Sequence, residues 1–204
     1  MKSQGLVCKF MFTVFAFGSF VFAEDALNLP DFSATQVFDS RKAPITMKVH
    51  RSGDSVRVDR SAAMSTVYVP SKRKVYNLTT YPDNTHQCVS MKPEQAKMLP
   101  SPLELLHGSK VKRTRVGEEV LEGHTCTVEK IVVTRPDGKV VESKVWQAQD
   151  LEGAPVKIES RIDEVTLSAF YRDISLGTPD ATFFAIPEKC TPFEKMWQVA
   201  EEKK

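Results

Sequence analysis

Apolar and polar residues alternate with a period of two along most of the chain. In the stretch 45–50, Ile45, Met47 and Val49 alternate with polar or charged residues, and 56–59 repeats the pattern. An apolar face opposite a polar face is typical of half-buried antiparallel strands. The alternation predicts a mainly β protein, with strands at 45–50, 56–59, 66–69, 74–79, 86–91, 125–134, 139–148, 156–162 and 165–176.

Short turn sequences separate these strands. Ser52, Gly53 and Asp54 lie between the first two, and turns that contain proline follow at 70–73, 82–84 and 135–138. In the last of these, proline favours the turn and a glycine is free to take the positive φ that closes it. Strands joined in sequence by short turns form a meander.

Helical signals are few. The stretches 93–98 and 102–106 each begin with a proline, which fits the first position of a helix, and Gly108 is a stop signal. Apolar residues at helical spacing over 191–201 predict an amphipathic C-terminal helix. About ten strands with two helical insertions predict one curved antiparallel sheet, an incomplete β-barrel that covers the short helices on its concave side.

The N-terminus has the pattern of a secretory signal peptide. Residues 1–23 begin with Lys2 and Lys9, continue through the largely apolar stretch 10–22 and end in Val-Phe-Ala. Thirteen residues span about 20 Å as a helix, less than the roughly 30 Å hydrocarbon layer. We therefore expect cleavage after Ala23, a single domain over 24–204, and no stable membrane insertion afterwards. Cys8 precedes the apolar stretch and lacks the preceding small residue of a lipid-attachment site, which argues against a lipoprotein.

The charge balance narrows the classes of partner. The chain has 28 Lys and Arg residues against 26 Asp and Glu, a formal net charge of +2. Loss of Lys2 and Lys9 with the signal peptide leaves equal numbers of both. The basic bias of a dedicated nucleic-acid binder is absent, and we expect no nucleic-acid partner.

Four segments, in this order, carry a resemblance to a known family. They are 32–38, 65–78 with a tyrosine and basic residues in a hairpin, 123–160 with Gly-His-x-Cys and Pro-Val-Lys-Ile-Glu, and 171–190 with Phe-x-Ile-Pro. Together they resemble the LolA-like superfamily of periplasmic lipoprotein carriers and their relatives. The resemblance implies an incomplete barrel whose short helices form a lid over an apolar cavity, and non-covalent binding of a lipid acyl chain or lipoprotein in the periplasm.

Two sets of site residues follow from this resemblance. In true carriers an arginine on an early strand latches the lid, and Arg51, Arg57 and Arg60 are all candidates here. The expected lining of the ligand cavity consists of Phe38, Met47, Tyr68, Tyr76, Met91, Met98, Leu103, Leu106, Trp146 and Phe170. Ordinary core packing is the alternative role for each of them, since a curved sheet has to fill its hollow.

The exported region contains three cysteines, Cys88, Cys126 and Cys190. The first two sit in matching His-x-Cys settings on predicted strands, and oxidation is favoured outside the cytoplasm. We expect a disulfide between Cys88 and Cys126. Unpaired thiols and pairing through Cys190 are alternatives. A tetrahedral zinc site is a further alternative, with ligands His86, Cys88, His124 and Cys126.

Signals for catalysis are weak. The four histidines are scattered, no Gly-x-Ser-x-Gly motif occurs, and no glycine-rich strand-to-helix turn is present to bind phosphate. We expect a non-enzymatic protein without a cofactor. The basic clusters 72–74 and 110–115 fit either a solvated sheet edge or a docking surface for lipid headgroups or an acidic partner.

Two functions from different classes are thus open. The leading hypothesis is a periplasmic carrier that holds an acyl chain or lipoprotein in its half-barrel and opens by movement of 93–108. The alternative is a cell-envelope sensor or adaptor domain that binds a protein partner on the same fold. A periplasmic metal-binding protein is a third class, and it depends on the two His-x-Cys strands.

Overall fold

Twelve strands form one sheet in the computed structural model, which describes residues 28–38, 43–93, 95–96, 102–106, 108, 110–135, 138–162 and 164–196. The expected signal peptide (1–23) and Met98 lie outside these residues. The strands are β1 (Phe32–Phe38), β2 (Ile45–Ser52), β3 (Ser55–Ser61), β4 (Met64–Val69), β5 (Lys74–Thr80), β6 (His86–Met91), β7 (Lys110–Leu121), β8 (His124–Thr134), β9 (Val140–Ala148), β10 (Pro155–Ile162), β11 (Val165–Leu176) and β12 (Thr191–Pro192).

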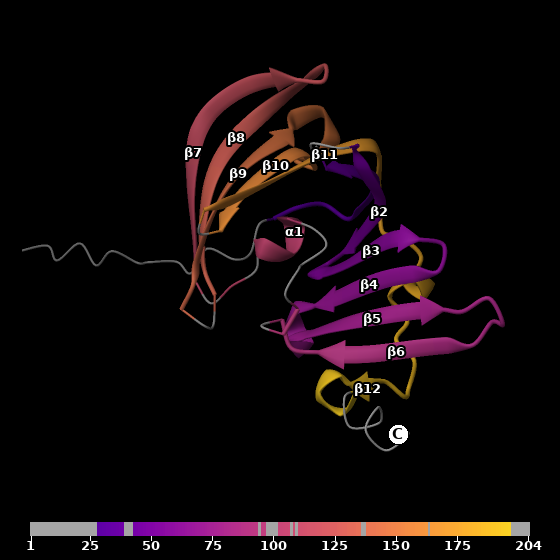
Figure 1. Cartoon of the computed structure of the whole chain (residues 1–204). Helices are drawn as coiled ribbons and strands as arrows, with labels where there is room; N and C mark the ends of the chain where they lie inside the picture. Colours follow the sequence, from indigo (N-terminus) through magenta and orange to yellow (C-terminus); the bar gives the residue numbers. More distant parts are fainter. Residues whose placement is uncertain are drawn as a thin grey trace, which may run out of the picture.

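The sheet is an open, curved surface with the order β12-β6-β5-β4-β3-β2-β1-β11-β10-β9-β8-β7. Two meanders, β1 to β6 and β7 to β11, join where β11 pairs antiparallel with β1. Figure 1 shows the sheet bending around the short helix α1 (Pro102–Leu105). The predicted fold class, a mainly β protein with an incomplete barrel around a short helix, is confirmed.

The turns form as their residues predict. Gly53 has a φ of +56° between β2 and β3, and Gly138 has a φ of +82° before β9. The Gly138 amide donates to the carbonyl of Arg135, and the Arg135 amide donates to the carbonyl of Lys139. The connections η1 (Pro70–Lys72), η2 (Gln149–Leu151) and η3 (Ala181–Phe184) are 3-10 turns.

The predicted helices are only partly present. The stretch 102–106 contains α1, as expected. In the stretch 93–98, residues 94, 97 and 98 are not described, and the Gln95 amide donates to the Lys92 carbonyl in a turn.

The expected C-terminal helix is wrong over 191–195, where the chain forms β12 and the 3-10 turn η4 (Phe193–Lys195). There the chain pairs with β6 instead. The end of the predicted helix, 197–201, lies outside the described residues. No helix in the described part of the chain is both long and apolar enough to span a bilayer.

Candidate ligand-binding face

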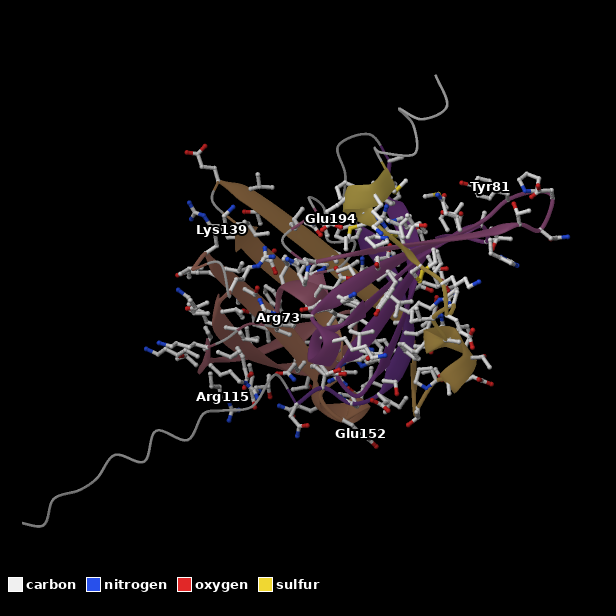
Figure 2. All side chains as sticks on the ribbon, turned by 90° about the horizontal axis from the view of Figure 1, so that it is seen from below. Arg73, Tyr81, Arg115, Lys139, Glu152 and Glu194 are labelled. Carbon is white, nitrogen blue, oxygen red and sulfur yellow. A yellow bond between two sulfur atoms is a disulfide. The ribbon has the colours of Figure 1, made fainter. Side chains whose placement is uncertain are left out.

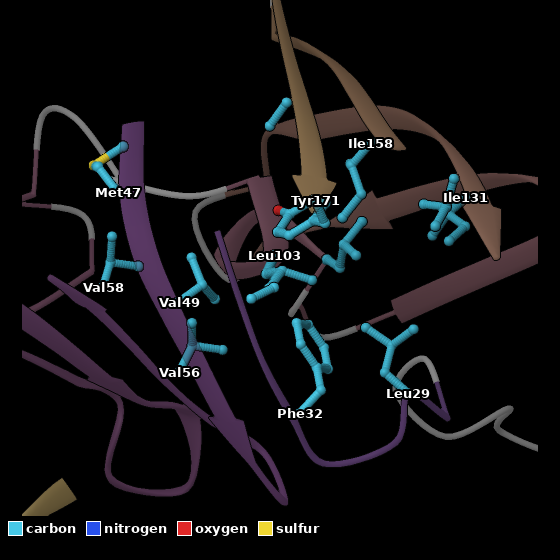
Figure 3. Close-up of a cluster of buried hydrophobic side chains, with 14 of the residues drawn as sticks. Leu29, Phe32, Met47, Val49, Val56, Val58, Leu103, Ile131, Ile158 and Tyr171 are labelled. Atoms are coloured by element: carbon cyan, nitrogen blue, oxygen red, sulfur yellow. The ribbon is translucent and has the colours of Figure 1, made fainter. Parts of the chain in front are cut away.

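The face of the sheet that bends around α1, called the concave face here, carries the largest apolar cluster. Because side chains alternate along a strand, every second residue of neighbouring strands points to this face. Phe32, Val49, Val56, Ile158 and Tyr171 all contribute to the cluster and are almost completely buried. Figure 3 shows these side chains converging on Leu103 of α1. The concave face is thus an apolar surface assembled from both meanders.

Helix α1 and the residue that follows it, Leu106, supply the side chains that fill the curve. Leu103, Leu105 and Leu106 are each 2% exposed or less, and Leu103 and Leu106 belong to the large cluster. A four-residue helix is not stable alone in water, because the first turn costs more conformational entropy than its hydrogen bonds return. Its place is therefore determined by tertiary contacts, to which the packing of these leucines contributes.

Arg51 is the early-strand arginine that lies on the concave face. It stands opposite Phe32 on β1 and Val56 on β3, both members of the apolar cluster. Its Nη1 donates to the carbonyls of Leu29 and Pro30 and lies 3.7 Å from the Asp31 carboxylate. Burial lowers the pKa of Arg51, against the opposing effect of Asp31 and Asp54. Within the described residues, Arg51 thus fixes the segment before β1 and makes no hydrogen bond to α1.

The nine expected cavity residues that the structure describes divide between the two faces. Phe38, Met47, Leu103 and Leu106 belong to the large concave cluster or pack against it. Tyr68 and Met91 lie on the same face in a neighbouring cluster, because Val56, Tyr68, Val75 and Met91 stand opposite one another across β3 to β6.

Three expected cavity residues lie on the opposite face, called the outer face here. Tyr76 follows Val75, Trp146 follows Val145, and Phe170 lies between Ala169 and Tyr171, so strand alternation turns all three away from α1. Trp146 donates a hydrogen bond to Glu119 and is covered by the ammonium groups of Lys144 and Lys157. The apolar character of these residues predicted that they are buried. Each is next in sequence to a residue of the concave face, however, and therefore lies on the outer face.

A C-terminal strap, residues 178–190, crosses the outer face of β3 to β6. Phe184 and Ile186 pack against the cluster of Val67 and Tyr76. The strap ends at Cys190, which forms a disulfide with Cys88 on β6. The chain then continues to Phe193, which packs in the concave cluster of Tyr68 and Met91. The strap and β12 therefore wrap around the β6 edge of the sheet.

This disulfide corrects the expected pairing of Cys88 with Cys126. Eight strands lie between β6 and β8 in the sheet order, so the matching His-x-Cys sequences are not neighbours. Cys126 is a buried free thiol, and burial raises its pKa. The observed bond is the alternative pairing through Cys190.

The alternative zinc site is wrong for the same reason. Cys88 is oxidised, His86 contacts Thr80 Oγ1 at 3.1 Å, and His124 Nδ1 lies 2.8 Å from Asp150 Oδ2. Among the residues that the structure describes, no three His, Cys, Asp or Glu side chains group in a way that holds a metal ion.

Polar side chains from adjacent strands meet the strap on the outer face. His50 Nδ1 lies 2.8 Å from Ser33 Oγ, and its Nε2 lies 3.5 Å from the Asp59 carboxylate. The His50 ring stacks on Phe183 with ring centroids 4.2 Å apart. Arg57 donates to the Phe183 carbonyl at 2.7 Å and to Asp59 at 2.6 Å. The scattered histidines in the sequence gave no sign of this grouping, which anchors the strap.

Comparison with known proteins gives only remote likenesses. No known family profile and no curated protein matches the sequence. Similar solved structures include PNGF-II (TM-score 0.44, 11% identity, 86% of this chain and 33% of that chain). The complex of Pseudomonas aeruginosa MucB with MucA is also similar (TM-score 0.41, 17% identity, 79% of this chain and 57% of that chain). A third similar structure is a LolA superfamily protein from Nitrosomonas europaea (TM-score 0.41, 9% identity, 79% of this chain and 92% of that chain).

A LolA superfamily protein is thus among the structural neighbours, as the sequence resemblance predicted. The chain spans a third of PNGF-II and 57% of the MucB chain. The proposed function rests on the geometry of the concave face.

Proposed function

We propose that this chain is a non-enzymatic periplasmic binding protein that holds a lipid acyl chain, free or on a lipoprotein, against its concave face. The observation that supports this most is the packing of α1. Leu103 and Leu106 occupy the curve of the sheet among apolar side chains from both meanders. An acyl chain has the same chemistry as these side chains and takes their place when α1 moves away.

The energies favour such an exchange. A buried CH₂ group gains about 0.8 kcal/mol, so a fully buried sixteen-carbon chain gains about 12 kcal/mol before ordering costs. Exposing two leucine side chains costs about 3 to 6 kcal/mol. The difference is about 6 to 9 kcal/mol. Micromolar binding requires about 8 kcal/mol, so it is the upper bound on affinity once the cost of ordering the chain is subtracted.

The test is a titration of the exported protein with a fluorescent fatty acid. We expect saturable binding, and tighter binding by the Leu103→Ala/Leu106→Ala variant, because α1 then competes less for the concave face. The matched control is Val67→Ala/Val128→Ala, beside Tyr76 and Trp146 on the outer face, which we expect to bind like the unmodified protein. Thermal melts confirm that both variants fold. Absence of binding in all three proteins contradicts the carrier function, and unchanged affinity in the α1 variant contradicts the role of α1.

The second candidate is a cell-envelope sensor or adaptor domain that binds a protein partner. One observation favours it, because α1 already fills the curve with side chains, as expected of a domain that takes no cargo. A folded protein that binds no fatty acid, with or without the α1 substitutions, supports this second candidate over the carrier.

A further inference from the structure

The two edges of the sheet differ in how far they are covered. At one edge, β12 pairs with β6 and the Cys88–Cys190 disulfide fastens the chain beside it. At the other edge, β7 is twelve residues long and, within the described residues, pairs only with β8. Figure 1 shows β7 along the outer rim of the sheet. In Figure 2, Arg115 of β7 lies on the opposite side of the molecule from Tyr81, beyond the end of β5. A long open edge is a ready template for another strand.

Strand β7 carries opposite charges in its two halves. Its first half contains Lys110, Lys112, Arg113 and Arg115, and its second half contains Glu118 and Glu119. It also exposes large apolar side chains, since Val116 is 58% exposed and Val120 is 75% exposed. The division of charge suits an antiparallel pairing of two identical strands, because the basic half of each strand then lies beside the acidic half of the other.

An irregularity between Arg115 and Gly117 puts the opposite charges on matching faces. Lys112 stands opposite Val132 of β8 and Glu119 stands opposite Cys126, two positions of β8 that share a face. Arg113 and Glu118 stand opposite Ile131 and Thr127, which share the other face. In a regular strand, residues seven positions apart point to opposite faces. The bulge therefore gives each face two basic residues in the first half of the strand and one acidic residue in the second half.

We propose that β7 pairs antiparallel with β7 of a second copy of this chain, about a two-fold axis between Arg115 and Val116. Lys112 then faces Glu119 of the second copy, Arg113 faces Glu118, and Val111 faces Val120. A shift of two residues in either direction leaves one oppositely charged pair in each half of the interface instead of two. A parallel arrangement in register brings like charges together, which is destabilising.

The contacts within one chain fit this arrangement. Glu119 accepts from Lys144 at 3.0 Å, and Arg113 donates to Glu129 at 2.6 Å. On one face, Lys112 of the second copy adds a positive charge beside Glu119, which already pairs with Lys144. On the other face, Glu118 of the second copy adds a negative charge beside Arg113, which already pairs with Glu129. The signs thus continue to alternate across the interface on both faces. This inference is independent of the proposed function, since the pairing uses neither α1 nor a ligand.

Charge exchange at Lys112 and Glu119 tests the pairing by sedimentation velocity of the exported protein at low ionic strength. We expect a concentration-dependent dimer, and at least a tenfold weaker dimer for K112E or E119K alone. An equimolar mixture of K112E and E119K restores the dimer, because each strand then supplies the charge that the other lacks. The double variant K112E/E119K restores it as well.

The control is K72E, which makes the same change of charge at an exposed lysine on η1, away from β7. It leaves the dimer unchanged. Thermal melts check that E119K, which loses the Trp146 and Lys144 contacts, remains folded. A monomer at all concentrations, a dimer that K112E does not weaken, or a mixture of the two variants that stays monomeric overturns the proposal.

Discussion

At the scale of single residues, Asp59 connects the sheet to the strap anchor. Its carboxylate accepts from Arg57 at 2.6 Å and lies 3.5 Å from His50. Burial by itself raises the pKa of Asp59, but the hydrogen bonds from His50 and Arg57 outweigh burial and hold that pKa below its ordinary value. The folded state therefore binds a proton on Asp59 less readily than the unfolded state does.

This difference sets the direction of a pH effect. The unfolded carboxyl titrates near pH 3.9, so the contribution of Asp59 is complete well above that pH and is lost as pH falls through the lower folded pKa. We predict that Asp59→Asn lowers the free energy of unfolding by about 1 to 2 kcal/mol at pH 7, as expected for hydrogen bonds to a charged group. Urea unfolding at pH 7, 5 and 3 measures the deficit, which shrinks toward pH 3.

Glu142→Gln is the matched control for this prediction. Glu142 pairs with Lys130 at 3.0 Å, and both side chains are about half exposed. Exposed pairs contribute little, so the control changes stability by less than about 0.5 kcal/mol at any of these pH values. A deficit of Asp59→Asn that persists unchanged at pH 3 contradicts the role of the ionised carboxylate.

At the scale of elements, the C-terminal strap depends on a bond between distant parts of the chain. Cys88 and Cys190 are 102 residues apart, and a bond that closes so long a loop removes much entropy from the unfolded chain. We predict that Cys190→Ser lowers the free energy of unfolding by about 3 to 5 kcal/mol, as measured by urea unfolding without reductant.

A thiol count checks the pairing that this prediction assumes. The oxidised exported protein has one reactive thiol after denaturation, that of Cys126, and none before it, because Cys126 is buried and burial raises its pKa. Three reactive thiols in denaturant mean that the disulfide is absent. Equal stability of the oxidised protein and Cys190→Ser also contradicts the predicted role of the bond.

Local sequence predicted the elements that local interactions determine. Period-two alternation located β2 to β6 and β8 to β11 to within a few residues, and Pro102 marked the start of α1. The alternation did not predict strand β7, because charged residues on both of its faces hide the pattern of a half-buried strand. The C-terminal segment has helical spacing, yet its start is extended because the Cys190 disulfide and the pairing with β6 are long-range constraints.

At the scale of the whole molecule, the sequence predicted a curved sheet around a short helix but not its register. That β1 pairs with β11, and that Tyr76, Trp146 and Phe170 face outward, depends on contacts between residues far apart in sequence. A one-residue change of register reverses the face of every side chain in a strand, so an apolar residue alone does not identify the cavity side.

The open sheet and its helix make one further prediction about ligand binding. If an acyl chain replaces α1, the molecule as a whole becomes more stable while α1 itself loosens. At a fatty-acid concentration of 100 times the dissociation constant, binding adds about 2.7 kcal/mol, which raises the melting temperature by about 5 to 10 °C for a chain of this size. We predict that the amides of 103–106 exchange faster with palmitate bound, while those of β1, β2 and β10 exchange more slowly.

Hydrogen exchange read by mass spectrometry, with and without palmitate, separates the two effects. In the free protein the Leu106 amide donates to the Leu103 carbonyl at 3.2 Å, and this bond is lost when α1 leaves the concave face. Slower exchange in both α1 and the sheet means that the acyl chain binds without displacing α1. Unchanged exchange and an unchanged melting temperature mean that no acyl chain binds. Only opposite changes in the helix and the sheet fit a site that α1 occupies until the acyl chain arrives.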